Sequence, residues 1–397
     1  MGEKFSLNAF GSVSLFCLVS PWAVAAPELD LGVVLDGTYQ SEARQWGMRD
    51  KGFGLGHSEI LMSSNIDQNF RGQLIAVIAS HGGTTEFEVE EAFVETLSLP
   101  LGVKIKAGRL LSNVGYLNSK HLHEDAFSDR PAVYRAVFGS HYFDDGAQLS
   151  WLAPTDTFVA ANAEMFSGKG WDVGYSDPAT VGVYTANLQI GDDVDDSNSW
   201  RLGLSTIYNA NGLGFASEDS SGSAHNHSGH DHSSHDHGDH GHSHGPAVTG
   251  KWLHGIDMTW KWAPEGNYKQ ENLRTTAEAW LINDRYDAQM ESIPNADDQA
   301  FGWYAELAYQ FTPNWTVSGR YGEMNAVTGE VHWHIDHHHG ELTKSDIQEA
   351  DIALDWHGSH FGRVRTQVTH EQLSEQSQTI FTVQYIMSFG AHPAHAF

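Results

Sequence analysis

The chain has 397 residues, a formal net charge of −29 at pH 7 and a single cysteine, Cys17. Such acidity argues against nucleic acid and anionic lipid head groups as partners and favours attraction of cations. Cys17 lies in the N-terminal segment that we expect to be removed on export, so the mature chain would have no cysteine. Neither disulfides nor thiolate catalysis nor thiolate metal binding is then available.

The first 25 residues resemble a secretory signal peptide. Lys4 supplies a short positive region, an apolar core follows, and Ala23 to Ala25 offers small residues for cleavage. A buried N-terminal helix is the alternative, but Pro21 would break it. We therefore expect export of a mature chain, residues 26–397, that forms a single domain.

Beyond this segment no run of eighteen apolar residues exists, which excludes a helical membrane span. Apolar and polar residues instead alternate with period two, as in Phe381, Val383 and Tyr385 against Thr382 and Gln384. This period predicts strands near residues 29–39, 54–63, 69–79, 84–97, 102–111, 145–153, 157–167, 180–190, 198–209, 251–262, 272–284, 300–311, 314–323, 346–356, 360–370 and 378–389.

The connections between these sixteen segments fall into two classes. Tight turns such as residues 99–102 and 153–156 follow even-numbered segments, and every long connection follows an odd-numbered one. No proline of the mature chain lies inside a proposed strand, where it would break the ladder. Tryptophans lie near proposed strand ends, as in interfacial aromatic girdles: Trp151, Trp200, Trp252, Trp262, Trp280 and Trp315.

These patterns predict an all-β fold: a closed antiparallel transmembrane β-barrel of about sixteen strands, with short periplasmic turns and long external loops. The segment 378–389 is expected to pair with 29–39, because both termini fall on the short-turn side. A soluble β-sandwich or solenoid is the alternative.

On these residues the chain resembles Gram-negative porin-like outer-membrane proteins. The tail FTVQYIMSFGAHPAHAF resembles the C-terminal assembly signal of that class, but residues 390–397 extend past Phe389, the aromatic at which such a signal usually ends. The resemblance implies location in the cell outer membrane, contact with its lipid and its assembly machinery, and a homotrimer.

The third external connection, residues 112–144, is long and acidic. In porins this loop commonly folds inward, so the resemblance places its ionisable residues at a pore constriction: His121, His123, Glu124, Asp125 and Asp129. We expect basic wall residues to face them across the pore and set a transverse field: Lys104, Lys106, Arg320, Arg363 and Arg365. The alternative is that the loop covers the mouth and these are ordinary solvated charges.

Residues 225–244 read HNHSGHDHSSHDHGDHGHSH. The tract has no apolar residue for a core, so it is predicted to be disordered without metal, within a disordered external loop at 217–248. Imidazole nitrogens suit Zn²⁺, with Cu²⁺ or Ni²⁺ as alternatives at the isolated loop; a merely hydrophilic loop is the other reading. The predicted ligands are His225, His227, His230, His232, His235, His237, His240, His242 and His244.

A second cluster, HWHIDHHH, spans residues 332–339. In an extended segment His332, His334, Asp336 and His338 share one face, whereas His337 and His339 point the other way. This set is either a defined metal site or an extension of the same metal-binding surface. With both clusters, the chain is similar to histidine-rich barrels associated with zinc uptake.

No catalytic constellation is found, so we do not expect an enzyme. Two functions remain: an outer-membrane channel that captures zinc at external loops and admits it to the periplasm, or a surface metal-binding or buffering protein without specific transport. The polar inner rows favour the channel. The isolated histidines are interpreted as lumen or rim residues: His57, His254, His357, His360 and His370.

Overall fold

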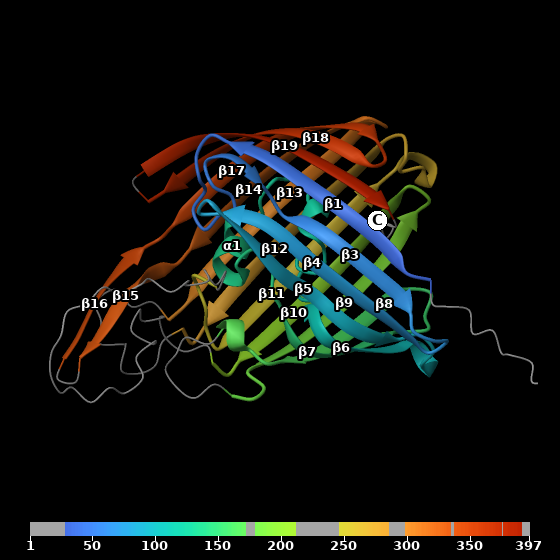
Figure 1. Cartoon of the computed structure of the whole chain (residues 1–397), viewed down its shortest axis with the longest axis horizontal. Coiled ribbons are helices and arrows are strands. Elements are labelled where there is room, and N and C mark those ends of the chain that lie inside the picture. The colour runs from blue at the N-terminus through green and yellow to red at the C-terminus, as the bar shows by residue number, and fades with distance from the viewer. Residues whose placement is uncertain are drawn as a thin grey trace, which may run out of the picture.

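The computed structural model of the chain describes residues 28–171, 179–211, 246–285, 298–334, 337–374 and 376–390. The expected signal peptide, residues 1–25, and the end of the tail, residues 391–397, lie outside the described residues. Within the described ranges the chain is mostly β-structure, and its strands follow one another in chain order around a closed wall (Figure 1).

The strands are β1 (Asp30–Gln40), β2 (Gly52–Leu55), β3 (Ser58–Asn65), β4 (Phe70–His81), β5 (Thr84–Thr96), β6 (Val103–Leu111), β7 (Phe143–Leu152), β8 (Phe158–Phe166), β9 (Val183–Asp195), β10 (Asn198–Asn209), β11 (Trp252–Trp262), β12 (Asn272–Asn283), β13 (Ala300–Thr312), β14 (Trp315–Asn325), β15 (Val327–His334), β16 (His337–Lys344), β17 (Ile347–Ser359), β18 (Gly362–Leu373) and β19 (Gln376–Gly390).

The barrel wall is antiparallel and has sixteen strands, because β2 and β3 are two halves of one strand that both pair with β1. The last strand, β19, pairs with β1 from Gly32↔Gly390 to Gln40↔Thr382, which closes the barrel. Each predicted segment corresponds to one wall strand, and the predicted closure is confirmed. The remaining strands, β15 and β16, form a separate hairpin that projects beyond the rim (Figure 1).

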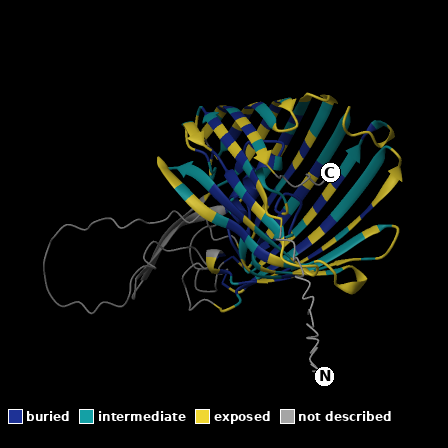
Figure 2. Cartoon of the chain, turned by 45° about the vertical axis from the view of Figure 1, so that its right-hand side comes forward, coloured by how far each residue is buried: buried dark blue, intermediate teal, exposed yellow. Residues whose placement is uncertain are grey.

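The two faces of the wall differ in exposure, as expected when successive residues of a strand point to opposite faces. On β19, Phe381 and Tyr385 are exposed, whereas Thr382 and Gln384 are buried. Buried and exposed residues alternate along the strands in this way (Figure 2). The outward row is apolar on many strands: Leu149, Leu188, Leu204, Ile256, Leu307, Ile352 and Val368. A hydrogen-bonded wall without edges and with an apolar outer face fits a bilayer.

The tryptophan girdle is confirmed in part. Trp151, Trp252 and Trp315 are exposed on the outer face. Trp280 was wrongly assigned to the girdle, because it is fully buried on the inward row of β12 and its indole N–H donates to Glu278 Oε1 at 2.8 Å.

The connection between β6 and β7, residues 112–142, lies inside the barrel and carries the α-helix of the described ranges, α1 (Ala132–Phe138). The helix begins after Pro131 and ends where Gly139 adopts a left-handed conformation, φ 58°. All seven of its residues are buried. Of the helices in the described ranges, none is long and apolar enough to cross a membrane.

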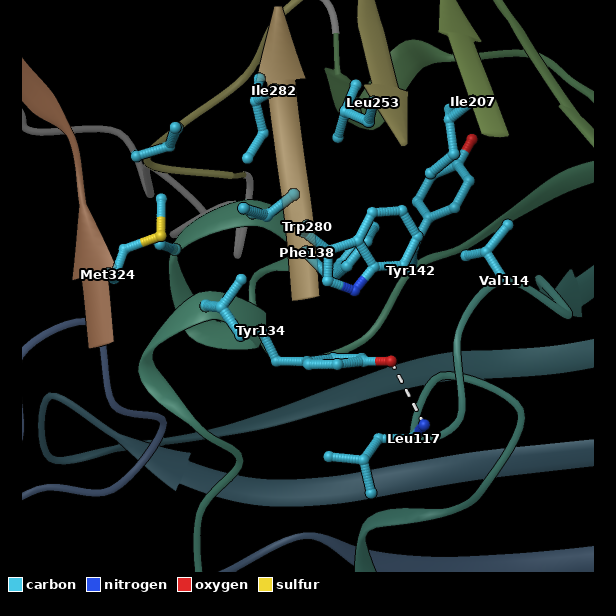
Figure 3. Packing of buried hydrophobic residues seen from close by; sticks show 14 of the residues in the cluster. Val114, Leu117, Tyr134, Phe138, Tyr142, Ile207, Leu253, Trp280, Ile282 and Met324 are labelled. Atoms are coloured by element: carbon cyan, nitrogen blue, oxygen red, sulfur yellow. Dashed lines mark hydrogen bonds between the residues drawn. The ribbon is translucent and has the colours of Figure 1, made fainter. Parts of the chain in front are cut away.

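Helix α1 packs against an apolar patch on the inner wall. Phe138 contacts the inward-facing Trp280, with ring centroids 5.0 Å apart (Figure 3). Tyr134 contacts the inward-facing Tyr304, with ring centroids 6.2 Å apart. Other members of the cluster come from the wall strands: Ile207, Leu253, Ile282, Met324 and Ile347. The external half of the inner wall is therefore less polar than the sequence suggested.

The same cluster corrects the boundary of the predicted disordered loop at 217–248. Residues 246–248 are described, and the Val248 side chain is fully buried. Its backbone N–H donates to Ala136 O at 2.9 Å, which ties this segment to α1. The rest of that loop, up to residue 245, lies outside the described residues.

We expect the detergent-folded protein to migrate on a denaturing gel at different positions before and after boiling, and to show extensive β-structure by circular dichroism, because the closed wall has no free edge from which to unfold. A predominantly helical spectrum in detergent would contradict the barrel.

Candidate functional site in the barrel lumen

The inserted connection is bound by arginines of the inner wall. Arg365 donates to Asp125 O at 2.8 Å, and Arg363 donates to His123 O at 2.7 Å. Arg320 stacks over the Phe127 ring, with its guanidinium carbon 4.3 Å from the centroid. The expectation that these three arginines face the loop across open space is wrong, because all three contact it: Arg363 and Arg365 supply donors to its buried carbonyls, and Arg320 packs on its Phe127 ring.

Two of these arginines are also closely paired with carboxylates of their own wall. Arg320 lies 2.8 Å from Asp351 Oδ2, and Arg365 lies 2.8 Å from Asp355 Oδ1. The acidic residues of the loop are paired in turn: Asp125 with Arg130 at 3.0 Å and Asp129 with Arg49 at 3.7 Å. The predicted transverse field between acidic loop and basic wall therefore does not arise from these groups.

Three of the remaining predicted constriction residues, Lys104, Lys106 and Glu124, lie apart from these contacts. Lys104 pairs with Glu95 of the same wall at 3.1 Å, and Lys106 lies over the Phe93 ring, 4.7 Å from its centroid. Glu124 is half-buried at the end of the 3-10 helix Leu122–Glu124.

Helix α1 has an ionic anchor of its own. Arg135 lies 3.0 Å from Glu349 Oε2 and 3.1 Å from Glu371 Oε1, and Arg44 lies 2.6 Å from Glu349 Oε2; all four side chains are nearly or fully buried. The first backbone N–H of the helix, at Ala132, donates to Glu349 Oε1 at 2.8 Å. Glu349 thus joins the β1–β2 connection, the helix and the wall.

Histidines and glutamates lie close together in a second contact region, where the 112–142 connection packs against β3 and β5. His57 Nε2 lies 3.3 Å from Glu90 Oε2 and 3.6 Å from Glu59 Oε1. His121 Nδ1 lies 3.6 Å from both Glu59 Oε2 and Glu90 Oε2. Ligand atoms of His57, Glu59 and Glu90 all lie within 4.8 Å of one another, so these residues could hold a metal ion.

Two further histidines surround this group. His123 Nδ1 lies 2.8 Å from Glu59 Oε1, and His141 Nε2 lies 3.0 Å from Glu90 Oε1. Glu91 completes the group, with Oε2 3.7 Å from His121 Nε2. We call these seven residues the lumen cluster: His57, Glu59, Glu90, Glu91, His121, His123 and His141.

Irregularities in two strands bring these side chains inward. The pairing of β4 with β5 shifts between Ile75↔Glu91 and Ala76↔Val89, so Glu90 is a bulge residue. Both Glu90 and Glu91 are consequently buried, whereas neighbours in a regular strand point to opposite faces. His57 occupies the break between β2 and β3, where the pairing with β1 also gains one residue.

The electrostatics of the lumen cluster are set by its carboxylates. Burial alone would lower the pKa of His121, but Glu59, Glu90 and Glu91 outweigh it and raise that pKa well above its usual value. For His141 the balance is reversed: burial lowers its pKa despite the nearby Glu90. The ion pairs of Glu59 and Glu90 with described residues involve imidazoles alone.

Five of the seven residues were missed from the sequence. His121 and His123 were placed at the constriction, but His57 was interpreted as an isolated lumen or rim histidine, and Glu59, Glu90, Glu91 and His141 were not considered. The sequence does contain one signal for this site, the consecutive residues Glu90 and Glu91 in a predicted membrane strand. In a regular strand one of them would face lipid, so the pair indicates a bulge that turns both inward.

The external histidine clusters are less fully described. The nine histidines between His225 and His244 lie outside the described residues, as does Asp336. The backbone of β15 and β16 pairs His332 with His339, Trp333 with His338 and His334 with His337. A hairpin thus replaces the single extended row predicted for 332–338, because the chain reverses between His334 and His337.

Comparison with known proteins supports the barrel and leaves the family open. No family model matches the chain. An uncharacterized protein of Aquifex aeolicus (strain VF5) is 26 % identical over 372 residues, which cover 87 % of this chain and 70 % of that protein.

Solved structures with the same fold are outer-membrane proteins. The anion-selective porin from Comamonas acidovorans has a TM-score of 0.55 at 10 % identity, covering 92 % of this chain and 100 % of its own. The outer membrane channel DcaP of Acinetobacter baumannii has a TM-score of 0.53 at 10 % identity, covering 91 % and 97 %. The trimer form of OmpT from Vibrio cholerae has a TM-score of 0.50 at 9 % identity, covering 92 % and 100 %. The chain therefore has the porin-like barrel fold of the outer membrane.

We expect Arg135→Ala to lower the free energy of unfolding by about 3–5 kcal/mol, because it leaves the buried Glu349 and Glu371 with less compensation. It should also make single-channel conductance larger or unsteady, because α1 loses an anchor. Urea unfolding in lipid vesicles and planar-bilayer recording measure the two effects.

The matched control is Arg109→Ala, which removes an arginine from an exposed pair with Asp145 at 2.8 Å. Its cost should be about 1 kcal/mol or less, with unchanged conductance. Equal effects of the two substitutions would contradict the anchoring role of Arg135.

Proposed function

We propose that the protein is a passive outer-membrane channel for divalent transition-metal ions, with zinc as its principal cargo. The external histidine clusters capture the ion, and the lumen admits it to the periplasm. The observation that carries this proposal is the lumen cluster, which sets imidazole and carboxylate groups inside the barrel beside the inserted connection. These are donors that suit borderline divalent metals.

The external part of the proposal is supported by sequence position. The tract 225–244 belongs to the connection between β10 and β11, and the second cluster belongs to the hairpin β15–β16, so both lie in long connections of the external rim. The formal charge of −29 favours cations near the protein.

A surface metal-binding or buffering protein is the second candidate. Packing of α1 against Trp280, Tyr304 and Met324 favours it, because this apolar cluster occupies lumen space near the external rim. A flux measurement separates the two candidates, since both predict metal binding at the loops and only the channel predicts passage.

We also infer a homotrimer that is inserted by the outer-membrane assembly machinery. The trimer form of the structurally similar OmpT supports the assembly, and the alternating last strand β19, complete to Gly390, supports recognition by the machinery.

Replacing the nine histidines of 225–244 by asparagine should reduce zinc uptake at low external zinc and leave it nearly unchanged at high zinc. Tethered ligands raise the local metal concentration, which matters least when metal is plentiful. Uptake of radioactive zinc into cells that depend on this protein measures the effect, and asparagine keeps the loop length constant.

The control is the same chain with the serines of that tract replaced by asparagine, which should transport like the parent. If the histidine variant takes up zinc normally at every concentration, and the parent protein shows no open channel in planar bilayers, the channel proposal fails and the buffering function takes its place.

A further inference from the structure

We propose that His57, Glu59, Glu90 and His121 bind one divalent transition-metal ion inside the barrel, with the wall and the inserted connection each supplying ligands. That this ion is the transported cargo rests on the proposed function. The binding site itself rests on the geometry of the four residues.

Ligand atoms of His57, Glu59 and Glu90 form one group within 4.8 Å, and His121 lies beside this group at distances expected between ligands of one ion. Zinc lies about 2.0–2.2 Å from nitrogen and oxygen ligands, so tetrahedral geometry separates neighbouring ligand atoms by roughly 3.3–3.6 Å. His57 Nε2 is 3.6 Å from Glu59 and 3.3 Å from Glu90. His121 Nδ1 is 3.6 Å from Glu59 Oε2 and 3.6 Å from Glu90 Oε2, whereas His57 approaches Glu59 through Oε1. Three of these contacts exceed hydrogen-bond length, the fourth, between His57 Nε2 and Glu90 Oε2, is a long hydrogen bond, and all four lengths fit ligands that share an ion.

Unsatisfied atoms point to the same site. Glu59 Oε2 and His121 Nδ1 are buried and have no hydrogen-bond partner in the described part of the chain, and the Glu59 side chain is fully buried. A buried carboxylate oxygen without a partner costs free energy that an ion at this position would recover. A single ion would satisfy both atoms.

The surrounding histidines orient the ligands. His123 and His141 contact Glu59 Oε1 and Glu90 Oε1, at 2.8 Å and 3.0 Å, and so fix the rotation of both carboxylates. Hydrogen bonds of this kind to metal-binding groups are typical of metal sites. The geometry therefore exists before an ion arrives.

The donor set restricts which ion can bind. Two imidazoles and two carboxylates suit zinc and its first-row neighbours, whereas Ca²⁺ and Mg²⁺ prefer shells made of oxygen. The His121 side chain keeps 17 % of its surface exposed, against 5 % or less for His57, Glu59 and Glu90. An ion would therefore enter past His121, beside Glu91.

The test is a crystal structure of the full-length protein grown with zinc, with diffraction recorded above and below the zinc absorption edge. We expect an anomalous peak about 2.0–2.2 Å from ligand atoms of His57, Glu59, Glu90 and His121. Glu59→Gln and His121→Asn should each lose the peak. Two variants are used because one lies in the wall and the other in the connection; heat-modifiable migration confirms that each is folded.

The matched control is Glu164→Gln. Glu164 is an equally buried lumen carboxylate whose described partners are hydroxyl, backbone and amide groups, with Gln148 Nε2 at 2.6 Å. This variant should keep the peak at full height. Absence of the peak in the parent protein, or its persistence in both Glu59→Gln and His121→Asn, would overturn the site.

Zinc flux into vesicles that contain the parent protein separates this inference from the proposed function. A peak at the four residues without flux leaves the site standing and removes the channel. Flux without the peak leaves the channel standing and removes the site.

Discussion

The ion pairs that hold the 112–142 connection inside the barrel are the interaction on which the rest of the lumen depends. Arg135 enters between Glu349 and Glu371, and Arg44 reaches the same carboxylate from another connection. A buried pair gains little net stability, yet losing one partner leaves a charge without water or compensation. The connection is therefore held in one position, and everything that it carries into the lumen is placed with it.

This anchoring changes how charge is distributed along the inner wall. Arg320 and Arg365 are matched by Asp351 and Asp355; Arg365 also donates to the backbone of the connection, and Arg320 packs on the Phe127 ring. The lumen cluster differs, because the carboxylates of Glu59 and Glu90 are paired with imidazoles, which are neutral in their unprotonated form. A divalent cation that displaces protons from these imidazoles would therefore find two carboxylates to compensate its charge.

The fold could be predicted from the sequence because the alternation of apolar and polar residues is a local pattern, and it recurs in sixteen segments. The lumen cluster could not be predicted, because its members come from four separate parts of the chain and depend on two irregularities of the pairing. Glu90 faces inward only through a bulge in β5, and His57 only through the break after β2. Trp280 shows the same limit: its position near a strand end indicated lipid contact, but the face that it occupies is set by register.

The two kinds of histidine site have different physical roles in the proposed channel. The composition of the tract 225–244 predicts no core, so wrapping an ion would cost this tract conformational freedom and weaken its binding. The four lumen residues are already ordered by packing and by His123 and His141, so they bind an ion at lower entropic cost. Passage through a channel also requires that the ion can leave. Glu91, 3.7 Å from His121 and outside the four ligands, offers a departing ion a neighbouring carboxylate, so exchange can proceed in steps between adjacent oxygens without full loss of coordination.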